Sequence, residues 1–475
     1  MADHSRCKII RRVVMKRKAL SIALSLSMIA AALSGCSVST DTGETQTTAQ
    51  DTGSDTDTGT TDTTDAKADN AQDTSTASAD EEEITWVFWD DLEASTDQMT
   101  QLYAQTVDRF NAEDNGYHVN VITTNLEEYD SKVNALIAAG DTPDLLICNP
   151  GPNADVYVEA GVVQPLNQYL DADTQWRDSF AGGMFDRVTY DGDIYGIPTN
   201  FAAACCFYNT EMFEAAGISE VPADMEGFLD ACAKLKEAGY TPITCSASTA
   251  WCLSMIAGYC MNREGVDTEA LNAGTAHWTD ESCVKGCEDL VAISKYFQDT
   301  YLGDSNDDAT AHFYNEEAAI LIQGSWCIAQ MNGNSDTIED KCGVFSFPSV
   351  DGKVGDMIVK TDNVLMSATT QHPEACVAFL KMLTDETAQK ATAEQAGKIP
   401  VTTVEVDTSK APKQFGYVSE LLANLTGTIG FYNESLVSVE AGDTFDNNMV
   451  SIVMGDETIE EGLQNIEDFY QENAW

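Results

Sequence analysis

Positive charge is scarce in this chain. Lysine and arginine together number 25, against 78 aspartate and glutamate residues, which gives a formal net charge of −53. Nucleic acids and anionic membrane surfaces attract proteins through basic patches. The composition therefore argues against both as partners, and we expect no nucleic-acid binding. The acidic excess leaves cationic ligands open.

Several signatures of cofactor chemistry are also missing. No C-x-x-C pair occurs, the five histidines lie far apart, and no glycine-rich loop of the phosphate-binding type is present. Asp304, Asn306 and Asp308 begin like a calcium loop, but Ala309 replaces the turn glycine and Asn315 the terminal glutamate. We therefore expect no metal and no cofactor.

Long uncharged apolar runs are rare, and the clearest lies near the start of the chain. Residues 19–33 follow the basic cluster Met15–Lys18. This layout is typical of a secretory signal, and the run is too short to span a bilayer, which takes ~20 apolar residues. Residues 1–14 resemble an upstream extension, so Met15 is an alternative start to Met1.

The apolar run ends at Leu33-Ser34-Gly35-Cys36, which resembles a bacterial lipobox. That resemblance implies that residues 1–36 form a signal peptide and that Cys36 becomes a lipidated N-terminus. Acyl chains add ~0.8 kcal/mol of membrane attachment per buried CH₂. The alternative is a cleaved secretory signal with an incidental cysteine.

Aromatic residues are absent from residues 37–80, where threonine, aspartate and serine predominate and Lys67 is the only base. Such a segment buries too little apolar surface to offset its chain entropy, and its like charges extend it. We expect residues 37–82 to form a disordered tether between a membrane anchor and a folded domain.

Cysteine is frequent in the remainder, and twelve cysteines lie between Cys148 and Cys376. Most have apolar neighbours, where a free cysteine behaves as a small hydrophobe. Secreted chains usually pair their cysteines. Scattered placement favours reduced thiols in an anaerobe, and one or two disulfides of undetermined pairing are the alternative.

Residues from about 83 to the C-terminus are long enough for two domains. Ile84–Trp89 is a continuous apolar run typical of a buried strand, and apolar residues recur at helical spacing over 99–110. A strand at 117–121, a helix ending near Gly140 and a strand at 143–148 follow. Alternating strands and helices predict βαβ units in a parallel sheet.

Ligands of such sheets gather beyond the carboxyl ends of the strands. Trp89-Asp90-Asp91 and Asn149-Pro150-Gly151 stand at those ends. Further along the chain, the pattern predicts a strand within 195–209 and helices at 225–238, 375–383 and 458–475.

Six segments, in order, resemble one known family. They are WVFWDD from Trp86, LIAAGDTPDLL from Leu136, YGIP from Tyr195, FYNTEMFEAAGI from Phe207, EEAAILIQGSW from Glu316, and EACVAFLKMLTDETAQ with AGKIPV from Glu374 onward. Together they resemble the extracellular solute-binding proteins of carbohydrate ABC transporters, the group that includes maltose-binding protein.

The resemblance implies a periplasmic-binding-protein-like α/β fold, with two lobes, a hinge and an interlobe cleft. Lobe one would comprise residues 83–199 and 352–398, and lobe two residues 200–351 and 399–475. The chain would cross between the lobes near Thr199–Phe201, Phe345–Asp351 and Lys398–Pro400. Closure about these crossings is hinge motion.

The resemblance also implies sugar recognition. Aromatic rings cover the apolar face of a pyranose, and polar side chains satisfy its hydroxyls. The expected ligand-binding residues are Trp89, Asp90, Asp91, Asn149, Asn200, Trp251, Trp326, Asn363 and Tyr432, with Phe431 as the alternative to Tyr432 and Glu93 as a further polar candidate. Core packing is the alternative role for the aromatic residues, and a solvated loop charge for Asp90 or Asp91. Cys148 and Ala202 depart from the maltose-binding pattern, which argues against an identical ligand.

Three hypotheses for the function follow. The first is a lipid-anchored receptor, monomeric and without enzymatic activity, on the extracytoplasmic face of a bacterial membrane. It would bind a mono- or oligosaccharide and deliver it to the permease subunits of an ABC transporter. The second is a receptor of the same fold for a cationic solute, such as a polyamine or iron. The third is a surface glycosidase, which needs two carboxyl groups ~5–10 Å apart.

Overall fold

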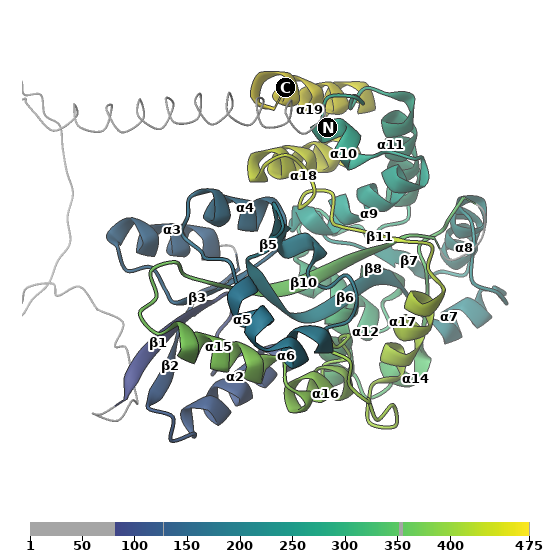
Figure 1. Ribbon diagram of the computed structural model, residues 1–475. Helices are drawn as coiled ribbons and strands as arrows, with labels where there is room; N and C mark the ends of the chain where they lie inside the picture. Colours follow the sequence, from purple (N-terminus) through teal and green to yellow (C-terminus); the bar gives the residue numbers. More distant parts are fainter. Residues whose placement is uncertain (1–80, 127, 351–354, 475) are drawn as a thin grey trace, which may run out of the picture. The chain divides into compact units, whose positions relative to one another are not determined.

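The computed structural model describes residues 81–126, 128–350 and 355–474 (Figure 1). The predicted signal peptide, Cys36 and nearly all of the tether lie outside these residues. The strands are β1 Glu82–Phe88, β2 Tyr117–Thr123, β3 Leu145–Cys148, β4 Thr189–Tyr190, β5 Asp193–Ile194, β6 Gly196–Asn209, β7 Thr241–Thr244, β8 Ala318–Gly324, β9 Cys342–Phe345, β10 Met357–Met366 and β11 Thr428–Ile429.

Helices connect these strands and cover the sheet. They are α2 Gln98–Asn111, α3 Tyr129–Ala139, α4 Pro152–Glu159, α5 Asn167–Ala172, α6 Thr174–Ser179, α7 Thr210–Ala215, α8 Met225–Glu237, α9 Ala250–Arg263, α10 Thr268–Asn272, α11 Glu281–Ser294, α12 Asn306–Tyr314, α13 Ile328–Asn334, α14 Ile338–Lys341, α15 Pro373–Leu383, α16 Glu386–Glu394, α17 Lys413–Asn424, α18 Val439–Met454 and α19 Ile459–Asn473, with short 3₁₀ turns η1 Asp186–Val188 and η2 Ser325–Cys327. No helix in the described ranges is long and apolar enough to cross a bilayer.

The main sheet follows the order β2-β1-β3-β10-β6-β8-β7, with β11 beside β10 and β9 beside β6. Strand β1 runs parallel to both β2 and β3, as the βαβ pattern predicts. Strand β10 is antiparallel to both β3 and β6. The carboxyl ends of β1 and β3 therefore meet at one edge, as expected from the sequence.

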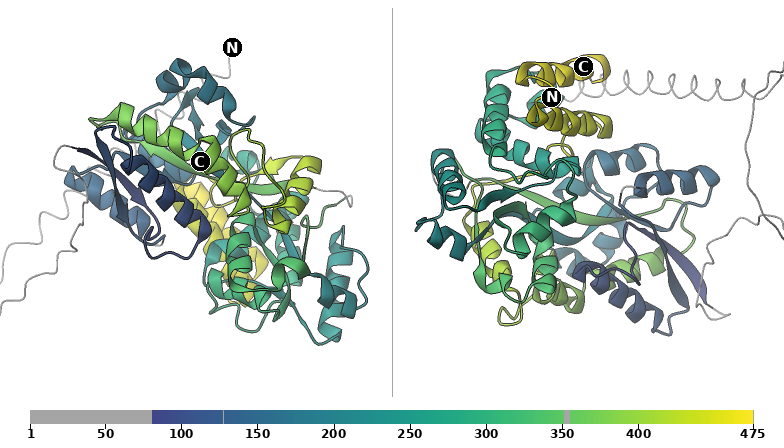
Figure 2. Two further views of the ribbon diagram at one scale, coloured as in Figure 1. Left: turned by 90° about the horizontal axis from the view of Figure 1, so that it is seen from below. Right: turned by 180° about the vertical axis from the view of Figure 1, so that it is seen from behind.

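The predicted helices form for local reasons that the sequence shows. The Asp97 side chain caps α2 by accepting from the backbone N–H of Thr100, and Gly140 ends α3 in the left-handed conformation that glycine adopts without strain. Thr458 caps α19 through a capping box with Glu461. Helices α2 and α15 pack side by side, as both views in Figure 2 show.

Apolar side chains gather in three cores. The first core includes Trp86, Phe110 and Phe379, and Trp86 of β1 is fully buried. The second core includes Trp278 and Phe445 and is closed by the packing of α9, α11, α18 and α19. A smaller third core, with Phe207 and Phe313, lies on the other face of β6 and β8.

Strands β6 and β10 each have residues in more than one core. The point where core membership changes shows where each strand passes from one core to another. On β6, Ile197 lies in the first core and Phe207 in the third. On β10, Ile358 lies in the second core and Val364 in the first. Core membership thus changes along β6 between Ile197 and Phe207, a stretch that contains the predicted crossing at Thr199–Phe201, and along β10 between Ile358 and Val364, where β10 pairs with β6.

The segment after Lys398 stays beside the first core for several residues. Val401 belongs to the first core, Thr402 bridges to Phe180, and the N–H of Thr403 donates to the carbonyl of Ser179. Val418 of α17 lies in the third core. Between Thr403 and Val418 the chain therefore passes from the first core to the third.

A buried carboxylate links the crossing segments. Asp362 of β10 accepts a 2.7 Å hydrogen bond from the Asn200 amide on β6, and the Lys398 ammonium lies 3.5 Å away. Asn200 also donates to the Tyr103 hydroxyl at 2.7 Å. Burial acts to raise the pKa of Asp362, but Lys398, Lys360 and the Asn200 hydrogen bond outweigh it and lower the pKa.

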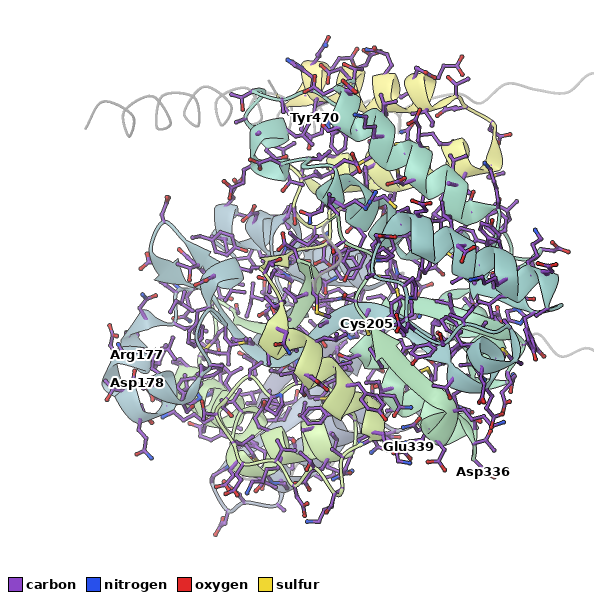
Figure 3. The ribbon with its side chains drawn as sticks, turned by 90° about the vertical axis from the view of Figure 1, so that its right-hand side faces the viewer. Arg177, Asp178, Cys205, Asp336, Glu339 and Tyr470 are labelled. Carbon is purple, nitrogen blue, oxygen red and sulfur yellow. The ribbon has the colours of Figure 1, made fainter. Side chains whose placement is uncertain are left out.

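The twelve cysteines from Cys148 to Cys376 are free thiols, and all are buried. Figure 3 shows Cys205 in the interior of the protein. By contrast, Arg177 and Asp178 point outward in the same view, and Arg177 Nε lies 3.1 Å from Asp178 Oδ1. Burial raises the pKa of the Cys205 and Cys148 thiols, so both stay protonated and unreactive.

We predict that Asp362→Ala destabilises the protein by about 3–5 kcal/mol near neutral pH, because it leaves the Lys398 ammonium buried without its carboxylate. Urea unfolding measures the change. Because the pKa of Asp362 is lowered in the folded state, this contribution is present above the unfolded pKa of about 4 and is lost as the pH falls through the lower folded value.

Asp407→Ala is the matched control, because Asp407 pairs with Lys410 at 3.2 Å on the exposed surface. It should leave the unfolding midpoint nearly unchanged. Equal effects of the two substitutions would contradict the structural role of Asp362.

Candidate functional site

The sheet edge predicted to bear the ligand is formed by the residues that follow β1 and β3. Trp89 is half-buried, and its indole lies against the rings of Phe88 and Tyr129, with centroids 6.1 and 5.7 Å away. The Lys360 ammonium of β10 lies 5.9 Å from the Trp89 ring. A flat ring and a cation thus stand together at this edge.

Asp90 and Asp91, also expected at the edge, hold their own loop in shape. Asp90 accepts hydrogen bonds from the hydroxyls of Ser95 and Thr100 at 2.6 and 2.8 Å. Asp91 is exposed and accepts from the backbone N–H groups of residues 93 and 94. Both carboxylates therefore have structural partners, and Glu93 is exposed.

The loop after β3 reaches toward a loop of the second core. The Asn149 side-chain oxygen is buried with no hydrogen-bond partner among the described residues. Gly151 has φ +74° and ψ −141°, and a β-carbon there would collide with the carbonyl oxygen of Glu434. Arg187 reaches the same carbonyl, with Nη2 donating at 3.3 Å. Gly151 and Arg187 thus both contact the 430–435 loop.

Three aromatic rings form a cluster on the second-core side, which we call the aromatic triad: Trp251, Trp326 and Phe431. The Trp251 and Trp326 centroids are 6.0 Å apart, and Phe431 lies 6.0 Å from Trp251 and 5.9 Å from Trp326. Trp326 folds over Gly324, where any β-carbon would overlap the indole. Both tryptophans stay partly exposed, so their rings remain available for contact.

Three further predicted site residues lie in the interior. Tyr432 stacks on Phe445 and donates to the carbonyl of Val266, whereas Phe431, which is equally buried at 3% exposed, packs against the two tryptophans. Asn200 belongs to the buried Asp362 network. Asn363 is fully buried and donates to the carbonyls of Cys148 and Thr361, but its side-chain oxygen has no partner in the described ranges.

Polar atoms without partners gather beside the triad. In the described part of the chain, the buried Trp326 Nε1, Asn433 Oδ1, Glu434 Oε2 and Asp446 Oδ1 make no hydrogen bond. A buried polar atom left unpaired costs about 1–3 kcal/mol, so such atoms mark places where a ligand or water completes the structure. Sequence patterns missed Lys360, Arg187, Asn433, Glu434 and Asp446, although Asn433 and Glu434 directly follow the aromatic pair at 431–432.

The charges at the site interact across the sheet. Lys360 Nζ lies 4.0 Å from Glu434 Oε1, which links the Trp89 edge to the loop of the triad. Asp446 accepts from the Asn433 amide at 3.0 Å. Burial raises the pKa of Asp446 to about 7, although hydrogen bonds from Ser254 and Asn433 oppose the shift.

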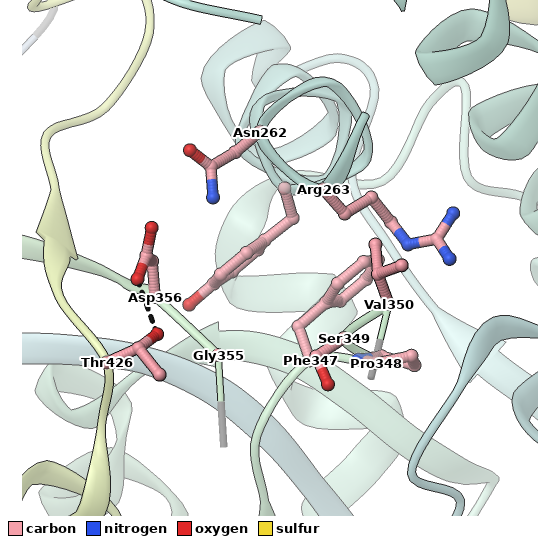
Figure 4. A pocket seen from close by; sticks show the side chains of 10 residues that line it. Asn262, Arg263, Phe347, Pro348, Ser349, Val350, Gly355, Asp356 and Thr426 are labelled. Carbon is pink, nitrogen blue, oxygen red and sulfur yellow. Dashed lines mark hydrogen bonds between the residues drawn. The ribbon is translucent and has the colours of Figure 1, made fainter. Parts of the chain in front are cut away.

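Two surface cavities are lined by other residues. One, of about 180 Å³, is lined by Asn262, Arg263, Phe347, Asp356 and Thr426, and the Thr426 hydroxyl donates to Asp356 at 2.6 Å (Figure 4). Another lies beside α7 and is lined by Tyr208, Phe213 and Val221. Neither contains a predicted ligand residue.

The suspected calcium loop has a local structural role. Ser305 caps α12 in a capping box with Asp308, and Asp304 accepts from Gln298 at 3.0 Å. Within the described ranges, no three His, Cys, Asp or Glu side chains converge as a metal site would require.

An α/β fold whose long strands β6 and β10 pass between separate cores is typical of two-lobed binding proteins. The chain belongs to the family of bacterial extracellular solute-binding proteins, whose pattern matches residues 105–415. This confirms the family expected from the sequence motifs.

Characterised and uncharacterised relatives share the family. An uncharacterized ABC transporter extracellular-binding protein of Pyrococcus horikoshii is 24% identical over 301 residues, which cover 62% of this chain and 66% of the relative. A multiple sugar-binding protein of Streptococcus mutans is 23% identical over 56% of this chain and 64% of its own length. The chain thus spans about two thirds of the length of these curated relatives.

A solved chitin oligosaccharide binding protein superposes with a TM-score of 0.76 and 23% sequence identity, over 83% of this chain and all of that structure. The likeness confirms the predicted periplasmic-binding-protein-like α/β fold. At this identity it establishes the fold alone.

We predict that Gly151→Ala destabilises the protein by about 1–3 kcal/mol, because alanine is strained at this backbone conformation and its β-carbon meets the Glu434 carbonyl. Thermal unfolding measures the loss. Gly161→Ala is the control, since Gly161 also has positive φ but faces open space. A loss no greater than that of the control would show that the contact with Glu434 contributes nothing.

Proposed function

We propose that this protein captures a mono- or oligosaccharide between its two lobes and delivers it to the permease of an ABC transporter. The observation that carries the proposal is the aromatic triad of Trp251, Trp326 and Phe431 beside buried polar atoms that lack partners. Membership of the solute-binding family supports capture without chemical change.

The triad offers what the apolar face of a pyranose needs. Indole rings present a large flat surface and lose little conformational entropy when they bind. Trp89 supplies a second ring from the first-core side, and Lys360 connects it with Glu434. A flat sugar with rings on both sides fits this arrangement better than a small inorganic ion does.

The unpartnered polar atoms suit the hydroxyl edge of the same sugar. Asn149 and Asn363 stand on the first-core side, and Glu434 and Asp446 on the second. Hydroxyls donate and accept, so they pair with amide oxygens, carboxylates and the Trp326 indole N–H alike. The relatives whose names state sugar or chitin oligosaccharide binding support the same ligand class for this chain.

Anchoring and delivery form the remainder of the proposal. The lipobox-like sequence at Cys36 supports a lipid anchor, and residues 37–82 supply an extended tether that holds the lobes near a permease. The predicted limits of the two lobes, with the crossings moved into β10 and past Thr403, supply the hinge for closure. We propose a monomer on the extracytoplasmic face of the membrane.

The glycosidase hypothesis finds less support. Asp90 and Asp91 are held within their own loop, so they do not face a scissile bond as a catalytic pair. Incubation of the purified protein with oligosaccharides separates the two hypotheses, because sustained release of products would contradict a pure binding protein.

We predict that Trp326→Ala weakens sugar binding tenfold or more, a change of about 1.4 kcal/mol, from an affinity in the micromolar range. A thermal-shift screen of a glycan library first identifies the ligand, and calorimetry then measures both affinities. Loss of the indole removes part of the platform for the sugar face.

Trp278→Phe is the control, since Trp278 is fully buried in the second core away from the triad. It should change stability and leave affinity intact. Unchanged binding by Trp326→Ala would remove the triad from the site, and no response to any glycan would refute sugar capture itself.

We predict that Cys36→Ser releases the protein from the membrane fraction into the medium or periplasm. The thiol is the group that carries the lipid in lipobox proteins, and serine cannot replace it. Detergent phase partitioning of cells expressing each form measures the anchor. A Cys36→Ser protein that stays in the detergent phase would show that another segment holds the membrane.

A further inference from the structure

Carboxylates from several elements gather at the site. Asp443 and Asp446 lie on α18, and Glu434 lies in the loop before it. From the first-core side, Asp130 of α3 faces Asp443, whose charge adds to burial in raising the pKa of Asp130. Asp443 and Glu434 likewise add to burial in raising that of Asp446.

Two of these acids are more than nine-tenths buried and have an unused oxygen. Asp446 is 8% exposed, and only one of its oxygens accepts from Asn433. Glu434 is 7% exposed, and one of its oxygens lies near Lys360. Asp446 Oδ1 and Glu434 Oε2 have no hydrogen-bond partner in the described ranges.

The neighbouring Asn433 adds a third unused acceptor. Its amide N–H donates to Asp446, so its side-chain oxygen must point elsewhere, and it too has no partner among the described residues. Asp446 Oδ1, Glu434 Oε2 and Asn433 Oδ1 are therefore three acceptor atoms without a hydrogen-bond donor in the described ranges. A hydroxyl brings one O–H, whereas an ammonium group brings three N–H donors and a full positive charge.

These acceptors lie beside the aromatic triad. Asn433 follows Phe431 by two residues, and Ser254, which hydrogen-bonds Asp446, lies one turn of α9 after Trp251. A cation held near aromatic faces gains further attraction from them. The aromatic triad and the acidic group thus share the 431–434 segment and the first turn of α9.

The two cations nearest the acids contact Glu434 rather than Asp446. Lys360 faces Glu434 and the Trp89 ring, and Arg187 Nη2 donates to the Glu434 carbonyl, while the buried Arg187 Nη1 has no partner in the described ranges. In the described part of the chain, no lysine, arginine or histidine forms an ion pair with Asp446. When Asp446 is ionised, a cationic ligand is therefore the partner that balances its charge.

We propose that the ligand is an amino sugar with a free ammonium group, which Asp446 and Asn433 hold beside the aromatic triad. This inference rests on the proposed sugar-binding function and narrows its ligand class. A neutral sugar satisfies the same acceptors one hydroxyl at a time and leaves the carboxylate charge unbalanced, so the site discriminates between the two.

Three oligosaccharide series of one β-1,4-linked skeleton test the proposal, because they differ only at carbon 2. Glucosamine oligomers carry an ammonium, N-acetylglucosamine oligomers an amide, and cello-oligosaccharides a hydroxyl. Calorimetry with the full chain should show glucosamine oligomers binding at least tenfold more tightly than either neutral series. Equal or weaker binding of the glucosamine oligomers, or no binding by any series, would overturn the proposal.

Asp446→Asn sharpens the test because it removes the charge and keeps the shape. It should reduce the affinity for glucosamine oligomers at least tenfold and reduce the affinity for the neutral series by a smaller factor, so that the preference for the ammonium is lost. Glu440→Gln, on the exposed side of the same helix, is the matched control and should change neither. An Asp446→Asn protein that keeps the full preference would overturn the proposal.

Folding of the variant is checked independently. The pKa of Asp446 is raised in the folded state to about 7, so its charge destabilises the native protein as the pH rises toward and above that value. Asp446→Asn should therefore melt at a higher temperature than the parent at pH 8, and the difference should vanish near pH 4.

Failure of this inference differs from failure of the proposed function. If neutral glycans of the library stabilise the protein and amino sugars do not, the amino-sugar inference is wrong and sugar capture stands. If no glycan of either kind stabilises the protein, sugar capture is wrong as well.

Discussion

The buried carboxylate of Asp362 is the constraint on which the two-lobed arrangement depends. It lies where β6 and β10 pass between the cores, and it is contacted by Asn200 of β6 and by Lys398, which precedes the passage from the first core to the third. A charge so deeply buried is tolerated only when its partners stay in place. The Asp362 network therefore holds β6, β10 and the Lys398 segment in fixed positions relative to one another.

The candidate ligand site differs from the Asp362 network, because several of its buried polar atoms have no hydrogen-bond partner in the described ranges. Asn149 and Glu434 come from different sides of the junction, and Lys360, two residues before Asp362, touches both the Trp89 ring and the Glu434 side chain. The same strand therefore holds the satisfied hinge network and one wall of the unsatisfied site. Recognition of a ligand by closure requires a hinge next to polar groups that the ligand can pair. The Asp362 network and the candidate site stand in that relation.

Sequence patterns predicted the elements well, because the period of the apolar residues decides them locally. Strands β1 and β3, helices α2, α8 and α19, and the burial of Trp86 all follow from spacing and capping residues. The crossing within β10 could not be predicted, since it depends on pairing with a strand some 160 residues away. Lys360, Glu434 and Asp446 were missed for a related reason: they stand on separate elements, and only tertiary packing brings them to the aromatic cluster. Phe431 and Tyr432 show the limit most clearly, because adjacent residues on an irregular loop point in different directions and no periodicity says which one faces the site.

The Asp362 network and the unpaired polar atoms of the candidate site together account for the proposed coupling of ligand binding to closure. A ligand shifts a conformational equilibrium only by the difference between its affinities for the two states. The triad and Asp446 lie beside the second core, and Trp89 and Asn149 beside the first, so a ligand proposed to contact both groups would favour their approach. Gly151 and Arg187 already join the first-core side to the Glu434 loop. In the proposed function, the contacts that select the ligand are therefore the same contacts that favour closure.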